Sequence, residues 1–213
     1  MRTLLTSKHE HAYRYRSYRS AFGYADAPWP VQLARTVVRR WPLLLGVAFA
    51  VFNLVTDDNP NALGALMVLL VATTAYVVIA ALDKPSWSWS VLGVLVVVIV
   101  ALRLLSDNVA IELGVFAAVV IGSITVGLIR GLWKRPGAYR WQPFAAVGFV
   151  AVCLIALLLD PLGGRVLIAV GLTGHAMWDA VHWRHHAVVS RSLAEWCAAL
   201  DLTLGAGILL MLV

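Results

Sequence analysis

Long unbroken runs of apolar residues, separated by short polar connections, dominate the pattern of this chain. Seven runs can be interpreted as helical spans, at about residues 41–56, 62–82, 88–105, 109–130, 143–159, 165–183 and 193–213. A helix needs ~20 apolar residues to cross ~30 Å of hydrocarbon, and several of these runs approach or exceed that length. The apolar positions are continuous and do not alternate, as they would in the strands of a membrane barrel. We therefore expect an all-α polytopic membrane protein with seven transmembrane helices.

Residues that end helices or favour membrane interfaces lie between the predicted spans. The connections contain Pro60, Pro85, Pro136-Gly137 and Asp160-Pro161. Tryptophan is enriched where a membrane meets water. Seven tryptophans lie near the predicted span ends: Trp41, Trp87, Trp89, Trp133, Trp141, Trp183 and Trp196.

The composition excludes an ordinary soluble domain. Of the 213 residues, 61% are hydrophobic and 13% are charged, whereas soluble domains carry roughly 25% charged residues. The two cysteines, Cys153 and Cys197, lie in different spans and form no CxxC motif. This excludes a disulfide scaffold and a thiol–disulfide exchange site.

The first 40 residues are more polar and more basic than the rest, and we expect the chain to have two domains. Residues 1–40 form a basic cytoplasmic arm, and residues 41–213 form the membrane domain. Within the arm, Val31–Arg40 has the pattern of a short amphipathic helix with arginines on its polar face. Such helices lie in the headgroup layer. We expect the arm to contact anionic lipid headgroups, and it could also dock to a partner subunit.

The basic residues predict the orientation of the chain. Fifteen of the 17 Lys and Arg residues fall in the N-terminal arm or after even-numbered spans, and only Arg103 and Arg165 fall on the other side. Cytoplasmic loops carry the excess of Lys and Arg. We therefore expect a multi-pass protein of the cell (plasma) membrane, with its N-terminus in the cytoplasm and its C-terminus outside. The net charge of +6 fits this orientation, and we expect no nucleic-acid partner.

The last two predicted spans concentrate residues that are costly in lipid. His175, Asp179 and His182 are spaced i, i+4 and i+7 and therefore share one helix face. On the next span, Cys197 and Asp201 are also one turn apart. Inserting a charged side chain at mid-membrane costs at least ~2.5–3.5 kcal/mol, so intramembrane ionisable residues are functional candidates.

An antiparallel hairpin would bring these two stripes face to face. For a turn centred near Val188, His175 lies level with Asp201 and Asp179 lies level with Cys197. His182 then lies beside Glu195. Thr73, Thr74 and Tyr76 lie at a similar depth on another span.

Histidine and aspartate one turn apart are a common metal-binding pair. We expect a zinc or iron site made by His175, Asp179 and Asp201, with His182 nearer the cytoplasmic mouth. Trp178, Glu195 and Cys197 are further candidates for the pocket. Without a metal, the same stripe could conduct protons, because histidine titrates near neutral pH. A third interpretation is a structural lock, in which these groups only hold two helices together.

His182, His185 and His186 resemble one HxxHH box of the membrane di-iron hydroxylases and desaturases. Those enzymes carry several such boxes, whereas this chain has six histidines in total. We therefore expect His185 and His186 to contact lipid phosphate instead.

Three functions remain open from the sequence. The first is a metal-dependent enzyme acting on a lipid or small amphipathic substrate. The second is a carrier of protons or metal ions, and the third is a non-catalytic subunit of a larger complex. The chain has no G-x-S-x-G motif, P-loop or dinucleotide fingerprint.

The orientation makes a direct prediction. A reporter that works only in the cytoplasm should be active when fused after Arg19 or inserted near Arg135, because both positions lie on the basic side. The same reporter fused after Val213 should be inactive. A C-terminus found inside would contradict the count of seven spans.

Overall fold

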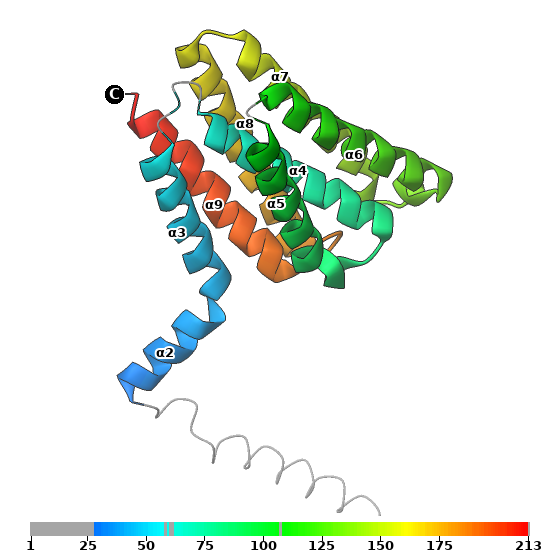
Figure 1. The fold of residues 1–213 in the computed structure, drawn as a ribbon. Coiled ribbons are helices and arrows are strands. Elements are labelled where there is room, and N and C mark those ends of the chain that lie inside the picture. The colour runs from blue at the N-terminus through cyan, green and yellow to red at the C-terminus, as the bar shows by residue number, and fades with distance from the viewer. Residues whose placement is uncertain (1–27, 58, 60–61, 107, 213) are drawn as a thin grey trace, which may run out of the picture. The chain divides into compact units, whose positions relative to one another are not determined.

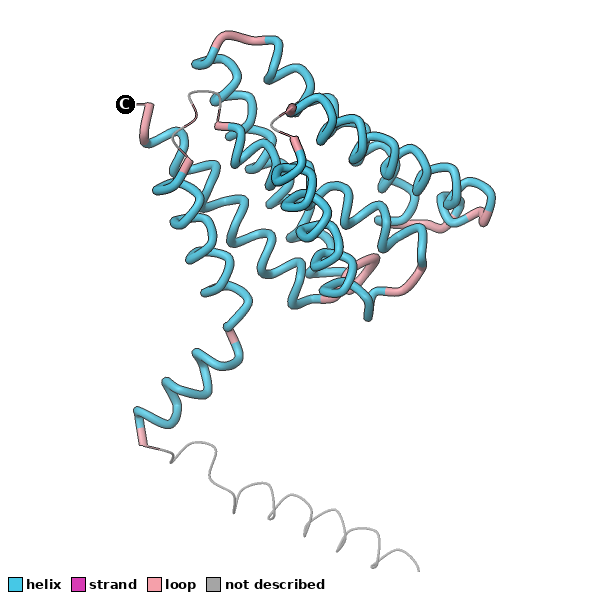
Figure 2. The backbone as a smooth tube through the Cα atoms, viewed as in Figure 1, coloured by secondary structure: helices cyan, strands magenta, loops and turns pink. Residues whose placement is uncertain are grey.

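A computed structural model describes residues 28–57, 59, 62–106 and 108–212, and every regular element in those ranges is a helix (Figures 1 and 2). Eight are α-helices and two are short 3₁₀ helices. In chain order they are α2 (Trp29–Arg39), α3 (Trp41–Thr56), α4 (Leu63–Leu82), η1 (Pro85–Trp87), α5 (Ser88–Leu105), α6 (Val109–Ile129), η2 (Leu132–Lys134), α7 (Ala138–Leu158), α8 (Pro161–His185) and α9 (Arg191–Leu210). The all-α class predicted from the sequence is confirmed.

The helix ends follow local capping chemistry. Asp160 accepts a hydrogen bond from the amide of Gly163, and Ser190 accepts one from the amide of Leu193, so the side chains cap α8 and α9. The helix α7 begins at Ala138, five residues before the predicted 143. Pro143 lies inside this helix, in its second turn, where it removes one backbone hydrogen bond.

The number of membrane spans is only partly established. Five segments of the described chain are long and apolar enough to cross a membrane: α4, η1 with α5, α6, α7 and α9. A sixth is obtained if α3 is counted together with the helix before it. α3 alone has 16 residues, and α8 is made more polar by its His, Asp and Arg residues. The count of seven spans and the orientation of the termini remain predictions.

The chain divides into two compact units, residues 1–41 and 42–213. The described part of the first unit contains α2, which covers most of the predicted amphipathic segment and ends at Arg39. The second unit is the helical bundle that carries the sites described below.

Within the bundle, α4 is the central helix. It packs against α5, α6, α7, α8 and α9 (Figure 1), and its side chains are buried around almost its whole circumference. In contrast, α5, α6 and α7 expose large apolar side chains such as Val97, Ile121 and Phe144. A soluble monomer rarely exposes contiguous apolar surface on this scale. Several helices are therefore suited to lie in a membrane.

Small residues allow the helices of the bundle to approach one another closely. A Cβ atom added to Gly205 of α9 would lie 2.9 Å from the carbonyl oxygen of Ala169 in α8. One added to Gly46 of α3 would lie 2.5 Å from the carbonyl oxygen of Trp196 in α9. Such contacts are typical of membrane helices, in which close backbone packing replaces the hydrophobic effect.

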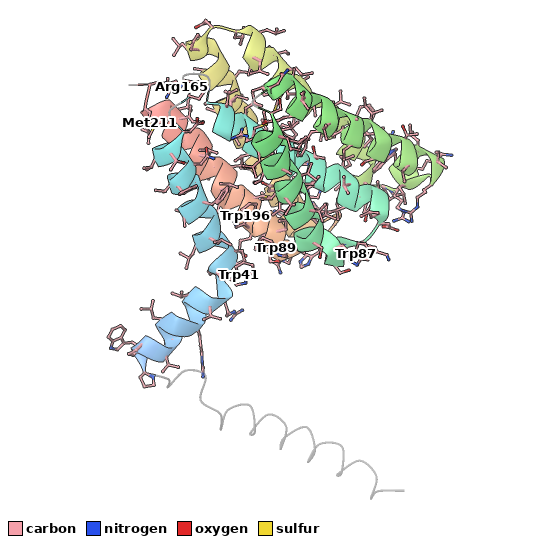
Figure 3. The ribbon with its side chains drawn as sticks, in the orientation of Figure 1. Trp41, Trp87, Trp89, Arg165, Trp196 and Met211 are labelled. Atoms are coloured by element: carbon pink, nitrogen blue, oxygen red, sulfur yellow. The ribbon has the colours of Figure 1, made fainter. Side chains whose placement is uncertain are left out.

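Figure 3 shows the two ends of the bundle. Trp87, Trp89 and Trp196 lie toward one end, and Arg165 and Met211 lie at the opposite end. Arg165 is near the start of α8 and Met211 follows the end of α9, so these two helices run antiparallel.

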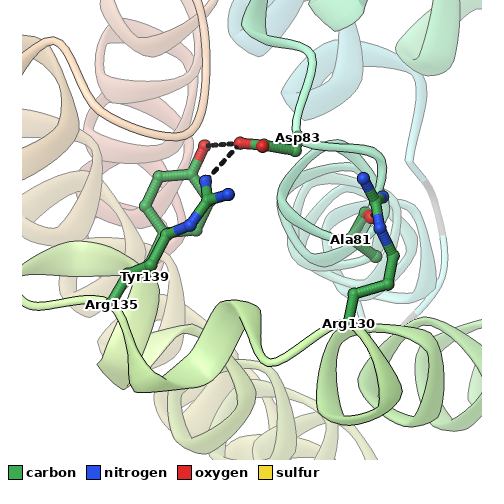
Figure 4. A network of polar contacts seen from close by, with 5 residues as sticks. All are labelled: Ala81, Asp83, Arg130, Arg135 and Tyr139. Atoms are coloured by element: carbon green, nitrogen blue, oxygen red, sulfur yellow. Dashed lines mark hydrogen bonds and ion pairs between the residues drawn. The ribbon is translucent and has the colours of Figure 1, made fainter.

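A polar network outside the spans ties the end of α4 to the start of α7 (Figure 4). Asp83, which caps α4 with φ of 58°, accepts a hydrogen bond of 2.7 Å from Arg135 Nη1 and one of 3.0 Å from the Tyr139 hydroxyl. These contacts stabilise the charged carboxylate. The hydrogen bond from Arg135 is the main reason that the pKa of Asp83 lies below its ordinary value of 3.8.

This network predicts a pH dependence of stability. Because the pKa of Asp83 is lowered in the folded state, its contribution is present above pH 3.8 and is lost as the pH falls through the folded pKa. The pair is partly exposed, so the contribution should be at most about 1 kcal/mol. Thermal unfolding in detergent between pH 6 and pH 3 measures it.

Asp83→Asn should lose stability at pH 6 and should lose less than the wild type on acidification. Tyr139→Phe keeps the ion pair and should retain most of the pH dependence. An unchanged pH profile in Asp83→Asn would show that the network contributes nothing.

Candidate metal centre

Three ionisable side chains from α8 and α9 converge in the bundle. His175 Nδ1 lies 2.7 Å from Asp201 Oδ2 and 3.4 Å from Asp179 Oδ2. One possible ligand atom from each residue can be chosen so that all three lie within 4.8 Å of one another. The His175/Asp179/Asp201 cluster could therefore hold a metal ion.

Two features of the sequence create this arrangement. His175 and Asp179 are one turn apart on α8, so both face the same neighbour. Asp201 comes from α9, at the level that the hairpin geometry predicts for His175. Gly205 lies one turn further along α9, where its missing side chain brings the two backbones together.

The turn between the helices is strained and buried. Val188 has φ of 68° and is fully buried, and a β-branched residue in this conformation is a rare outlier. Such strain, of order 1–3 kcal/mol, persists only where the surrounding structure imposes it. The amide of Ser190 also donates to Ser88 Oγ at 2.9 Å, which ties the turn to the start of α5. Contacts with other parts of the bundle therefore fix the register between α8 and α9.

The cluster is sealed from solvent, and its hydrogen-bonding capacity is unfilled. His175 is 1% exposed, and Asp179 and Asp201 are 0% exposed. Within the described chain, His175 Nε2, both Asp179 oxygens and Asp201 Oδ1 have no hydrogen-bond partner. In the part of the chain that the structure describes, no lysine or arginine forms an ion pair with Asp179 or Asp201. Buried polar groups are normally satisfied, so these atoms are available to a ligand.

Aromatic rings enclose the cluster. Tyr76 of α4 meets His175 edge-on at 5.2 Å between ring centroids, and Phe149 of α7 meets the same ring at 4.9 Å. The Tyr76 hydroxyl is buried near Asp179. Sequence reasoning noted Tyr76 only by its depth. It missed Phe149, because an aromatic residue in an apolar span carries no distinguishing signal.

His182 lies beside the cluster and is not one of its three converging ligands. It is fully buried, and its Nδ1 lies 2.8 Å from the backbone oxygen of Trp178, which leaves Nε2 without a partner in the described chain. Its ring packs edge-on against Tyr76 at 5.0 Å and against Trp178 at 4.7 Å. Tyr76 thus contacts both buried histidines.

The other predicted pocket residues differ in position. Cys197 is 1% exposed and lies close enough to Asp179 and Asp201 to interact with them electrostatically. Glu195 is half-buried at the start of α9 and is not one of the converging ligands. His185 and His186 are exposed at the end of α8 and are not among the converging ligands.

An apolar groove adjoins the cluster on the side of α7. This α7/α8 groove has a volume of about 450 Å³, and its lining includes Phe149, Gly174, Met177 and Trp178. Phe149 also packs on His175, and Trp178 also packs on His182. A single layer of aromatic rings therefore separates the groove from the buried histidines.

The contact across the hairpin is testable. In a background without Cys153 and Cys197, cysteines replacing His175 and Asp201 should cross-link readily, because their side chains meet across the helices. A matched control that keeps the native Cys197, one turn from Asp201, as the second cysteine should cross-link with position 175 far less. Preferential cross-linking of the shifted pair would contradict the register.

No protein-family model, curated protein or solved structure matches this chain. Its function must therefore follow from the chemistry of the cluster and from its surroundings.

Proposed function

We propose that this protein is a membrane-embedded, metal-dependent enzyme that acts on a lipid or small amphipathic substrate. Its His175/Asp179/Asp201 cluster binds one divalent transition metal ion, zinc or iron. The observation that carries the proposal is the convergence of three fully buried ligand side chains with unpartnered polar atoms.

The charge of the cluster supports a cation. Two carboxylates in an apolar interior carry an effective penalty of several kcal/mol each unless they are paired or neutralised. His175 is the ion-pair partner of both carboxylates in the described chain, and one imidazolium could balance only one of them. A single divalent ion would neutralise both carboxylates.

The geometry supports a site with an open position. For ligand bonds of 2.0–2.2 Å, tetrahedral coordination places ligand atoms about 3.4 Å apart. The separation of His175 Nδ1 and Asp179 Oδ2 is already 3.4 Å, and that of His175 Nδ1 and Asp201 Oδ2 is 2.7 Å. The distance between His175 Nδ1 and Asp201 Oδ2 would have to increase by less than 1 Å. Three protein ligands with a free fourth position are typical of catalytic zinc.

The residues around the cluster have the properties of a substrate site. A bound metal would polarise a substrate oxygen or activate a water molecule. The α7/α8 groove offers an apolar chain a place beside the cluster. His182 Nε2 and the Trp178 indole N–H are unpartnered in the described chain, and together with the Tyr76 hydroxyl they can orient a polar group or move a proton.

We also propose the arrangement in the membrane that the sequence predicts. Seven spans with a cytoplasmic N-terminus would place the cluster in the cytoplasmic half of the plasma membrane. The basic residues of that side, with the amphipathic α2, favour contact with anionic headgroups. The arm could also dock to a partner subunit, which would be the role of a non-catalytic component.

A proton carrier is the second candidate. The contacts of Tyr76 with both His175 and His182 favour it, because they connect two titratable rings through one hydroxyl-bearing side chain. The outer halves of α8 and α9 are nearly all apolar. A continuous polar route across the membrane is therefore not apparent along these helices, and the enzyme is favoured.

Elemental analysis tests the proposal. Gently purified wild-type protein should carry about one zinc or iron per chain. His175→Ala and Asp201→Asn each remove a ligand and should lower metal retention by roughly tenfold or more. Thr74→Val is the matched control, because Thr74 is equally buried and its hydroxyl donates to Leu70 of its own helix. This variant should keep its metal.

Wild type that stays metal-free after incubation with zinc or iron would contradict the metal site. The enzymatic part is tested in vesicles of a total lipid extract, where the metal-loaded wild type should convert at least one lipid species. Asp179→Asn should not. A loaded protein that converts none of these lipids would contradict a lipid-acting enzyme.

A further inference from the structure

A polar pocket and an apolar groove adjoin each other elsewhere in the bundle. The pocket, called here the headgroup pocket, has a volume of about 430 Å³ and is lined by residues that include Asn53, Asp57, Gly64, Arg103 and Glu112. The groove, called here the chain groove, has a volume of about 400 Å³ and runs between α3, α4, α5 and α9. Both volumes are in the range of ligand sites.

The two spaces are continuous, because Asn53, Gly64 and Arg103 line both of them. One end of this combined space is polar, and the other is lined by apolar and aromatic side chains such as Phe49, Leu92 and Trp196. Such a shape fits an amphiphile. We infer that the protein binds a phospholipid with a primary-amine headgroup, its head in the headgroup pocket and one acyl chain in the chain groove.

The headgroup pocket contains a buried carboxylate that is only half satisfied. Glu112 is 2% exposed, and its Oε1 lies 3.3 Å from Arg103 Nε. Its other oxygen, Oε2, is buried and has no hydrogen-bond partner in the described chain. A buried carboxylate oxygen without a donor is unfavourable, so the pocket is suited to a ligand that brings N–H groups.

Two more acceptors converge nearby, above Gly64. A Cβ atom added to this glycine would lie 2.8 Å from Asp57 Oδ2 and 3.1 Å from Asn53 Oδ1. Asn53 Oδ1 is buried and has no partner in the described chain. Asp57 is held in place, since its Oδ2 accepts a hydrogen bond of 2.9 Å from the Gly64 amide. Three acceptor side chains therefore surround one volume, which suits an ammonium group with three N–H donors.

Arg103 supplies the opposite charge. Its Nε faces Glu112, and its side chain is 47% exposed. Arginine presents five donors in a planar fork and binds phosphate in a bidentate manner. The two terminal nitrogens can therefore bind the phosphate while the acceptors bind the amine. A choline head has no N–H donor and would leave the acceptors unsatisfied.

The position of the chain groove favours an acyl chain as its occupant. It runs beside α4 and α5, two of the segments that can span a membrane. Val96 and Val100 of its wall are exposed, so the groove opens on a surface that lipid would cover. The site shares no lining residue with the His175/Asp179/Asp201 cluster, and the inference does not depend on the metal.

Native mass spectrometry of the whole protein in detergent tests this inference. Phosphatidylethanolamine, phosphatidylcholine and phosphatidylglycerol with identical acyl chains are titrated separately. The wild type should bind the ethanolamine lipid about tenfold more tightly than the choline lipid, because only the former can donate to Glu112 and Asn53. Glu112→Gln or Asn53→Val should reduce this preference to about threefold or less.

Glycine variants test the groove. Gly93 lines the chain groove, whereas Gly114 is an exposed glycine of α6 that does not line it, and an added Cβ meets no atom within 4 Å at either position. Gly93→Leu should lower the binding of the ethanolamine lipid about tenfold, and Gly114→Leu should leave it unchanged. Equal binding of the ethanolamine and choline lipids by the wild type, or tighter binding of the glycerol lipid, would overturn the headgroup assignment. Equal binding by the two glycine variants would overturn the groove assignment.

Discussion

The contact between His175 and Asp201 is the constraint around which the bundle is organised. It places ionisable groups deep between two helices, at positions that are 1% and 0% exposed. In an apolar interior the attraction between charges is strong, but the loss of hydration is large as well. The surroundings must therefore hold the two helices in one register, because a slip of one turn would separate Asp201 from His175.

The rest of the bundle satisfies this requirement by close packing. Gly205 removes the steric obstacle between α8 and α9, and the strained turn at Val188 sets where the chain reverses. Tyr76 from the central helix and Phe149 from α7 cover the histidine ring on further sides. Since packed interiors deform little, these contacts hold the three side chains of the cluster in place.

Polar chemistry in this protein is concentrated in a few places within a bundle that is otherwise apolar. The His175/Asp179/Asp201 cluster combines imidazole with carboxylates and suits a transition metal. The headgroup pocket combines carboxylate and amide oxygens with one guanidinium and suits a zwitterion. Each adjoins an apolar groove or lies one aromatic layer from one. Under the two proposals made above, this pairing would serve ligands that are dissolved in the bilayer.

The sequence by itself determined the helical class, most helix boundaries to within a few residues, and the facing of His175 and Asp201. These follow from local rules, since apolar run length, capping residues and the 3.6-residue period act over one or two turns. The packing of distant helices established that Tyr76 and Phe149 enclose the cluster and that Glu112 shares a pocket with Asn53. Those contacts join helices that are far apart in the chain, and their geometry depends on how α4 and α7 pack. An apolar sequence hardly encodes that packing, because many apolar residues satisfy a lipid-facing position and an interior one equally well.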